Sequence, residues 1–167
     1  MILGMSLSTF TMVHVIISLI AIVSGIIVMF GLLGCRRMPG LTAIFLLFTI
    51  LTSATGFLFP FEKLLPSHMI GILSLVLLAI ACFALYGTKL SGAWRWVYVV
   101  TAMISLYLNV FVLIIQAFLK VPALHALAPS VPPSEPPFAI LQGIVLVFFV
   151  IVIIGAVRRF RPMPAYA

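Results

Sequence analysis

The chain has 167 residues, of which 65% are hydrophobic and only 7% are charged. A water-soluble domain carries roughly a quarter charged residues, so this composition excludes a soluble globular protein and indicates a protein that lipid covers. The net charge is +7, but the basic residues stand at the ends of hydrophobic segments, as topology signals do, which argues against a nucleic-acid-binding role.

Five hydrophobic segments follow one another along the chain. Each has about the 20 residues that a helix needs to cross the hydrocarbon core of a bilayer. Their continuous hydrophobic character excludes the alternating strands of a membrane β-barrel. We therefore predict an all-α fold, with one transmembrane domain made of five helices. The expected spans are residues 12–34, 41–59, 67–86, 94–119 and 138–157.

The first segment has no basic residues before it and no convincing signal-peptide cleavage site, so we expect it to remain as a membrane helix. His14, Ser18, Ala21 and Gly25 are spaced so that they share one face of this helix. Ala21 and Gly25 form a small-xxx-small pair, which lets a neighbouring helix approach closely. We predict that this face points into the bundle.

The second and third segments carry similar faces. Thr52 and Gly56 belong to a stripe of small and hydroxyl-bearing residues on the second segment, and His68 and Gly71 begin a comparable stripe on the third. We expect Thr52, Gly56 and Gly71 to take part in helix packing. On the fourth and fifth segments, polar amide side chains replace them: Asn109, Gln116 and Gln142.

The fourth segment begins with Trp94, Trp96 and Tyr98, and such aromatic residues anchor helices at membrane–water interfaces. After this segment, the loop at residues 120–137 contains six prolines. Proline lacks a backbone N–H and favours extended backbone. We expect this loop to be an extended strap across one face of the bundle.

The orientation follows from the basic residues. One set of helix ends holds seven Lys and Arg residues, and the other set holds two, Lys63 and Lys120. The side richer in Lys and Arg is generally cytoplasmic. The sequence therefore predicts an N-terminus outside the cytoplasm and a C-terminus inside it.

With this topology, the polar residues of the spans gather in the outer half of the bundle. They are His14, His68, Asn109, Gln116 and Gln142. One interpretation is hydrogen bonding between helices, which is common in membrane proteins. The other is a ligand site. In such a site His14 and His68 would bind haem b from its two sides, hold a metal ion together with Glu62, or hydrogen-bond a quinone.

No residue pattern specifies a reaction. Glu62 and Glu135 are the only acidic residues, and both lie in predicted loops, so the spans lack paired carboxylates for acid–base catalysis. There is no Ser-His-Asp set, glycine-rich phosphate loop or HExxH motif, and Cys35 and Cys82 show no metal-binding spacing. The sequence predicts no catalytic residue.

Three stretches, residues 53–61 (SATGFLFPF), 92–129 and 134–138 (SEPPF), resemble segments of a group of small bacterial inner-membrane proteins to which no activity is assigned. The resemblance extends over nearly the whole chain. It implies a multi-pass protein of a bacterial inner membrane and implies no substrate, cofactor or catalytic residue.

Two functions remain open. The first is a non-enzymatic scaffold or accessory subunit, which lies in the lipid bilayer and packs with itself or with a larger membrane complex. The second is a small redox or ligand-binding protein that uses the outer pocket around His14 and His68. The sequence favours the first, because polar residues of these kinds commonly serve helix packing and no reaction motif accompanies them.

Overall fold

The computed structural model describes residues 1–63 and 66–162. Its helices are α1 (Leu7–Leu33), α2 (Pro39–Gly56), α3 (Pro66–Cys82) with the π-helical turn η1 (Phe83–Gly87), α4 (Trp94–Lys120), the short α5 (Pro122–His125) and α6 (Pro136–Arg159). Five of these, with α3 and η1 counted together, are long and apolar enough to cross a membrane. The predicted all-α fold with five spanning helices is confirmed.

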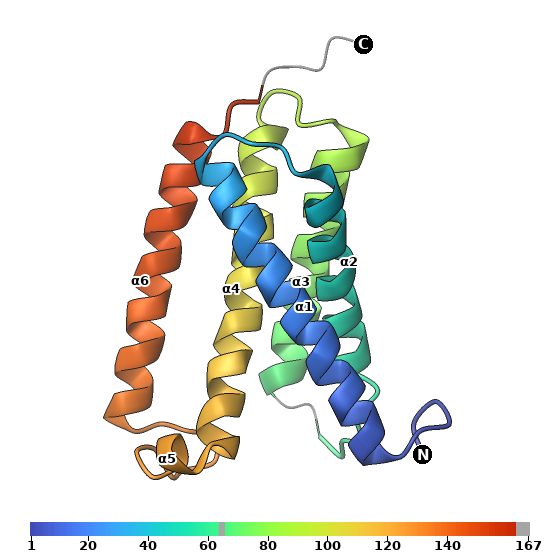
Figure 1. The fold of residues 1–167 in the computed structure, drawn as a ribbon, viewed down its shortest axis with the longest axis vertical. Helices are drawn as coiled ribbons and strands as arrows, with labels where there is room; N and C mark the ends of the chain where they lie inside the picture. The colour runs from blue at the N-terminus through green and yellow to red at the C-terminus, as the bar shows by residue number, and fades with distance from the viewer. Residues whose placement is uncertain (64–65, 163–167) are drawn as a thin grey trace.

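Helix α4 lies in the middle of the bundle (Figure 1). It packs against α1, α2 and α3, and α6 packs against it as well. α2 packs against both α1 and α3, whereas the Cα atoms of α1 and α3 do not come within 8 Å of each other in the described residues. The start of α1 and the end of α6 lie at opposite ends of the bundle, as an odd number of spans requires.

The helix boundaries differ from the predicted spans where local caps decide them. α1 begins at Leu7 rather than at residue 12, because the Ser6 side chain caps it by accepting a hydrogen bond of 3.2 Å from the Thr9 backbone N–H. α6 begins at Pro136 rather than at residue 138. Proline is tolerated there because the first N–H groups of a helix have no partner within it.

The loop that the prolines predicted to be an extended strap is partly helical. Residues Pro122–His125 form α5, which begins with proline in the favourable first position. Beyond it, the loop is closed by Glu135, whose carboxylate accepts hydrogen bonds from the Ser130 backbone N–H at 3.0 Å and the Ser134 backbone N–H at 3.1 Å. The prediction of an extended strap is therefore wrong for Pro122–His125.

The hydrophobic core contains residues of all five spanning helices, and one of its close contacts lies where α1, α2 and α4 meet. A Cβ atom added at Gly25 would lie 2.6 Å from Leu106 Cδ1 and 2.9 Å from the Phe45 ring, and both of these side chains are fully buried. Membrane helices gain little from hydrophobic burial against lipid, so close packing of this kind supplies much of their mutual attraction.

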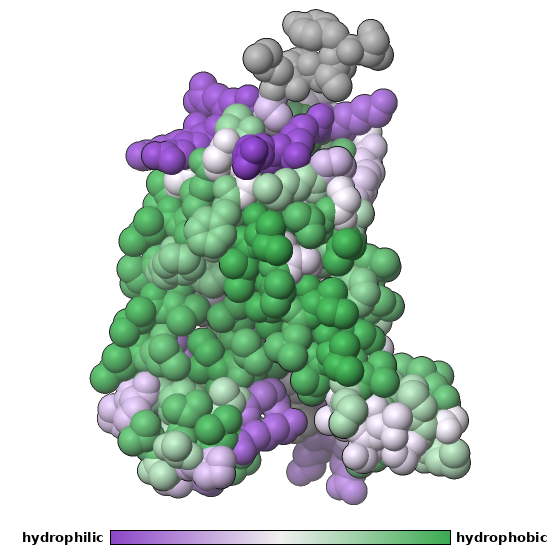
Figure 2. Space-filling model, in the orientation of Figure 1, coloured by the Kyte–Doolittle hydropathy of each residue, from purple (hydrophilic) through white to green (hydrophobic). Residues whose placement is uncertain are grey.

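On the face seen in Figure 2, hydrophobic residues cover the middle of the molecule and form a hydrophobic belt, and hydrophilic residues gather at its ends. α6 contributes a row of large exposed side chains to this belt: Ile140, Ile144, Val147, Ile151 and Ile154. Apolar patches of this size are rare on soluble monomers, whereas a bilayer covers them. The chain is therefore a multi-pass membrane protein.

The two ends of the bundle differ in charge. We call one the basic end; it carries Arg36, Arg37, Lys89, Arg95, Arg158, Arg159 and Arg161. We call the other the N-terminal end, because α1 begins there (Figure 1); Glu62 and Glu135 belong to the loops that precede α3 and α6 at this end.

Candidate functional site

His14, on the inner face of α1, is joined to α2 near the N-terminal end. Its Nδ1 lies 2.7 Å from the Thr55 hydroxyl oxygen. That hydroxyl donates its only hydrogen to the Leu51 carbonyl at 2.7 Å, so His14 Nδ1–H is the donor between the two side chains. The imidazole also packs edge-on against Phe59, with 5.2 Å between the ring centroids.

His68, in the first turn of α3, is buried with only 5% of its surface exposed. Its ring lies against Phe61 and Phe57, at centroid distances of 4.2 Å and 5.6 Å. Gly71, one turn further along α3, gives the Phe57 ring room, since an added Cβ atom would lie 3.1 Å from it. The side chain of His68 is thus packed among aromatic rings.

The two histidines face different parts of the chain. His14 contacts Thr55 and Phe59, whereas His68 contacts Phe57 and Phe61. α2 stands between the helices that carry them, a neighbour relation that the sequence left open. Within residues 1–63 and 66–162, no group of three or more His, Cys, Asp or Glu side chains is placed to hold a metal ion.

Asn109 and Gln142 connect helices, and Gln116 does not. Asn109 donates from Nδ2 to the Thr49 hydroxyl at 3.4 Å, which joins α4 to α2. Gln142 donates from Nε2 to the Phe111 carbonyl at 3.1 Å, which joins α6 to α4. Gln116 is exposed on α4, so the helical spacing from Asn109 does not bring it into the bundle.

Of the residues predicted to pack helices, some lie at contacts between helices and others form hydrogen bonds within their own helix. Ala21 and Gly25 are buried on α1, and Gly56 lies beside His14, with 4.0 Å between an added Cβ atom and His14 Cε1. The hydroxyls of Ser18 and Thr52 donate instead to carbonyls of their own helices, each at 2.8 Å. Such hydrogen bonds allow a hydroxyl to sit inside a helix bundle without a partner on another helix.

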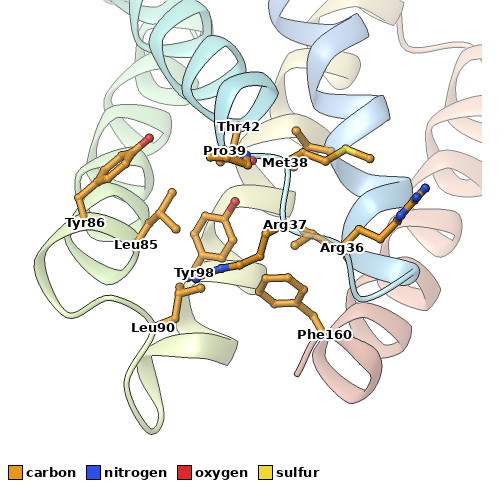
Figure 3. Close-up of a pocket in the computed structure, with 12 residues that line it drawn as sticks. Arg36, Arg37, Met38, Pro39, Thr42, Leu85, Tyr86, Leu90, Tyr98 and Phe160 are labelled. Atoms are coloured by element: carbon orange, nitrogen blue, oxygen red, sulfur yellow. The ribbon is translucent and has the colours of Figure 1, made fainter. Parts of the chain in front are cut away.

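A cavity of about 280 Å³ opens at the basic end, far from the histidines (Figure 3). Its lining combines cationic, hydroxyl-bearing and apolar side chains. The residues are Val28, Leu32, Arg36, Arg37, Met38, Pro39, Thr42, Leu85, Tyr86, Leu90, Tyr98 and Phe160. The ligand pocket expected from the sequence lay in the other half of the bundle, around His14 and His68.

The sequence does not reveal this cavity, because the presence of each of its polar residues can be explained without a binding site. Arg36 and Arg37 served as topology signals, and Tyr98 was interpreted as an interface anchor. In the structure Tyr98 is 2% exposed, whereas Trp94 and Trp96 are 37% and 46% exposed and so behave as interface residues do. The usable signal is Thr42, a hydroxyl residue three positions after Pro39, which ends the Arg-Arg-Met-Pro turn between two spans.

Arg95 shapes the cavity without lining it. Its guanidinium donates hydrogen bonds to the carbonyls of Val157, at 2.8 Å, and of Phe160. These carbonyls lie at the C-terminal end of α6, where helix carbonyls lack partners and carry partial negative charge. Arg95 therefore holds the end of α6 against α4 and keeps Phe160, 2% exposed, in the cavity wall.

Comparison with protein families, curated proteins and solved structures finds no match for this chain.

Proposed function

We propose that the protein is a non-enzymatic scaffold or accessory subunit of a membrane complex. The proposed setting is a bacterial inner membrane, with the basic end in the cytoplasm. The observation that carries the proposal is that three polar side chains of the spans form hydrogen bonds from one helix to the next. His14 reaches α2, Asn109 reaches α2, and Gln142 reaches α4.

These three contacts form a continuous series. They join α1 to α2, α2 to α4 and α4 to α6. Hydrogen bonds between membrane helices contribute about 0.6 kcal/mol each on average, so together they stabilise one arrangement of the helices by on the order of 2 kcal/mol. A fixed arrangement of this kind suits a protein whose role is to present a constant surface to a partner.

The surface that suits a partner lies on α6. Ala139, Gly143, Leu146 and Val150 share one face of this helix, and all four are exposed. An added Cβ atom at Gly143 would meet nothing within 4 Å. Ala139 and Gly143 thus repeat, on the outside of the bundle, the small-xxx-small pattern that Ala21 and Gly25 use inside it. Such a pair lets a transmembrane helix of another subunit approach closely.

The test compares complexes extracted from the native membrane in mild detergent. Gly143→Leu should reduce the native mass of the complex without lowering the unfolding temperature of the purified chain, because a Cβ atom at this position meets nothing within 4 Å. Ile144→Leu, at a position that is exposed on α6 but lies off this face, is the matched control and should preserve the mass. A wild-type protein that always migrates as a monomer would refute the scaffold proposal.

The alternative remains a small redox or ligand-binding protein around His14 and His68. The rings of Phe57, Phe59 and Phe61 lie against the two imidazoles, so a haem or quinone bound there would have to displace aromatic side chains. An absorption spectrum of the protein purified from its native membrane separates the two functions. A haem Soret band, or a bound quinone in the extracted lipid, would favour the alternative.

A further inference from the structure

We infer that the cavity at the basic end binds the phosphate group of an anionic membrane lipid. The inference is independent of the scaffold proposal, because it concerns the opposite end of the molecule from His14 and His68 and none of the exposed face of α6. The cavity has a volume of about 280 Å³, which is that of several water molecules, and is large enough to admit a phosphate group with adjoining headgroup atoms.

The charge of the cavity favours an anion. Arg36 and Arg37 line it, and neither side chain forms an ion pair within residues 1–63 and 66–162. The two glutamates are the only acidic side chains of the sequence, and both belong to the loops at the N-terminal end, so no Asp or Glu side chain stands beside these arginines. Guanidinium groups present paired N–H donors that match the oxygen atoms of a phosphate.

Hydroxyl groups supply further donors on the inner side of the cavity. Tyr98 projects from α4 with its hydroxyl directed towards Thr42 and Pro39 at the start of α2 (Figure 3). Arg37 extends beside the Tyr98 ring in the same view. The N-terminal turn of α2 begins at Pro39, and the positive end of this 18-residue helix adds to the potential that an anion meets.

The apolar part of the lining indicates a lipid rather than a free anion. Val28, Leu32, Leu85, Leu90 and Phe160 form that part of the wall. The lining combines two arginines of the basic end with apolar residues of the spanning helices, as expected at the depth of lipid headgroups. An amphiphile can place its phosphate against Arg37 and its glycerol and upper chain atoms against the apolar wall. Inorganic phosphate gains nothing from that wall.

Local backbone features build the cavity from two turns. Cys35 has a left-handed conformation with φ of 55°, and the next residue, Arg36, donates its N–H to the Gly31 carbonyl at 2.8 Å, which folds the turn back over the end of α1. On the other side, the π-helical turn η1 carries Leu85 and Tyr86 to the cavity. π-Helical turns occur frequently at functional sites.

The experiment titrates phosphatidylglycerol into the full chain held in phosphatidylcholine nanodiscs, and measures the unfolding temperature and, by native mass spectrometry, the bound lipid. We expect phosphatidylglycerol to stabilise the wild type. The double variant Arg36→Gln/Arg37→Gln should bind it on the order of tenfold or more weakly. Tyr98→Phe removes one donor and keeps the ring, so its affinity should fall by a smaller factor.

The matched control is Arg158→Gln/Arg159→Gln. It removes the same charge from the same end of the molecule, and its residues are exposed and do not line the cavity. It should keep the wild-type response to phosphatidylglycerol. An equal loss in both double variants would mean that phosphatidylglycerol acts through general surface charge, and this would overturn the inference.

A second arm distinguishes the lipid from a soluble anion. Inorganic phosphate is added to the protein in pure phosphatidylcholine, and we expect no shift in the unfolding temperature. If phosphate alone reproduces the shift, or if phosphatidylglycerol stabilises neither the wild type nor Tyr98→Phe, the lipid site is refuted. If the double variant does not fold, Arg37→Gln alone and Tyr98→Phe decide between these outcomes.

Discussion

At Gly25 the backbone of α1 approaches its neighbours so closely that no Cβ atom fits. The atoms that such a Cβ would meet, at 2.6 Å and 2.9 Å, belong to Leu106 and Phe45. Both side chains are fully buried, so neither can swing into open space. Gly143 on α6 provides a natural comparison, because it also lies within a helix but has free space around it.

Gly25→Ala should destabilise the bundle, by about 1–3 kcal/mol, because an extra methyl group in a packed core forces its neighbours to move. Gly143→Ala should cause no loss and a gain of up to about 1 kcal/mol, since alanine favours the helix more than glycine does. The measurement is thermal unfolding in one detergent. If the two variants lose stability equally, the close contact at Gly25 does not hold α1 in place.

The sequence could predict which residues share a helix face, and it could not predict what each face meets. Helical spacing places His14, Ala21 and Gly25 on one side of α1, because their rotation about the axis depends only on their positions in the chain. Whether His14 meets Thr55 or His68 depends on which helix lies beside α1. That choice is made by side-chain packing between distant segments, and helical spacing within one segment carries no information about it.

At the scale of an element, the loop before α6 is organised by one carboxylate. The Ser130 hydroxyl donates to Glu135 at 2.8 Å, in addition to the backbone N–H groups of Ser130 and Ser134. Desolvation raises the pKa of Glu135, but these hydrogen bonds outweigh it and hold the pKa below its ordinary value of 4.5.

The lowered pKa gives the loop a pH dependence with a definite sign. The contribution of the Glu135 carboxylate to loop stability is fully present above the unfolded pKa, near 4.5, and is lost as the pH falls through the lower folded value. We expect the Ser130 and Ser134 amides to be protected from hydrogen exchange at neutral pH in the wild type and less protected in Glu135→Gln. Below the folded pKa, the two proteins should exchange alike.

The readout is the exchange rate of each amide after correction for its intrinsic pH dependence. Glu62→Gln is the control, because it removes the other carboxyl group of the same end and Glu62 makes no hydrogen bond to this loop among the described residues. Equal protection of the two amides in wild type and Glu135→Gln at neutral pH would show that the loop is held by other contacts.

The same loop shows why elements between the spans were harder to predict than the spans. A span is specified by some 20 consecutive apolar residues, so a few unfavourable positions do not hide it. The helix Pro122–His125 has only 4 residues, which is too short to show a helical pattern in the sequence. The six prolines of the loop predict extended backbone instead. The Glu135 network depends on three side-chain and backbone groups meeting, and residue composition does not record this.

For the whole molecule, the sequence predicts the charge at the two ends but not the order of the helices in space. The position of α4 between α3 and α6 follows from packing and was not predictable from the hydrophobic segments. The charge asymmetry was predictable, because each basic residue is assigned to an end by counting spans. Seven Lys and Arg residues stand at one set of helix ends, against Lys63 and Lys120 at the other. This asymmetry predicts a cytoplasmic basic end.

Two exposed positions allow that orientation to be tested without moving any charge. Cys35 is exposed in the turn between α1 and α2 at the basic end, and Val131 is 77% exposed in the loop between α5 and α6 at the N-terminal end. A membrane-impermeant maleimide on intact cells should label Val131→Cys in a chain lacking Cys35 and Cys82. In a Cys82→Ala chain, it should label Cys35 only after the membrane is permeabilised.

The opposite pattern would reverse the orientation and place the arginine-lined cavity outside the cytoplasm, where the inner-leaflet lipids could not reach it. Labelling of both sites in intact cells would contradict a fold in which five helices separate the two ends.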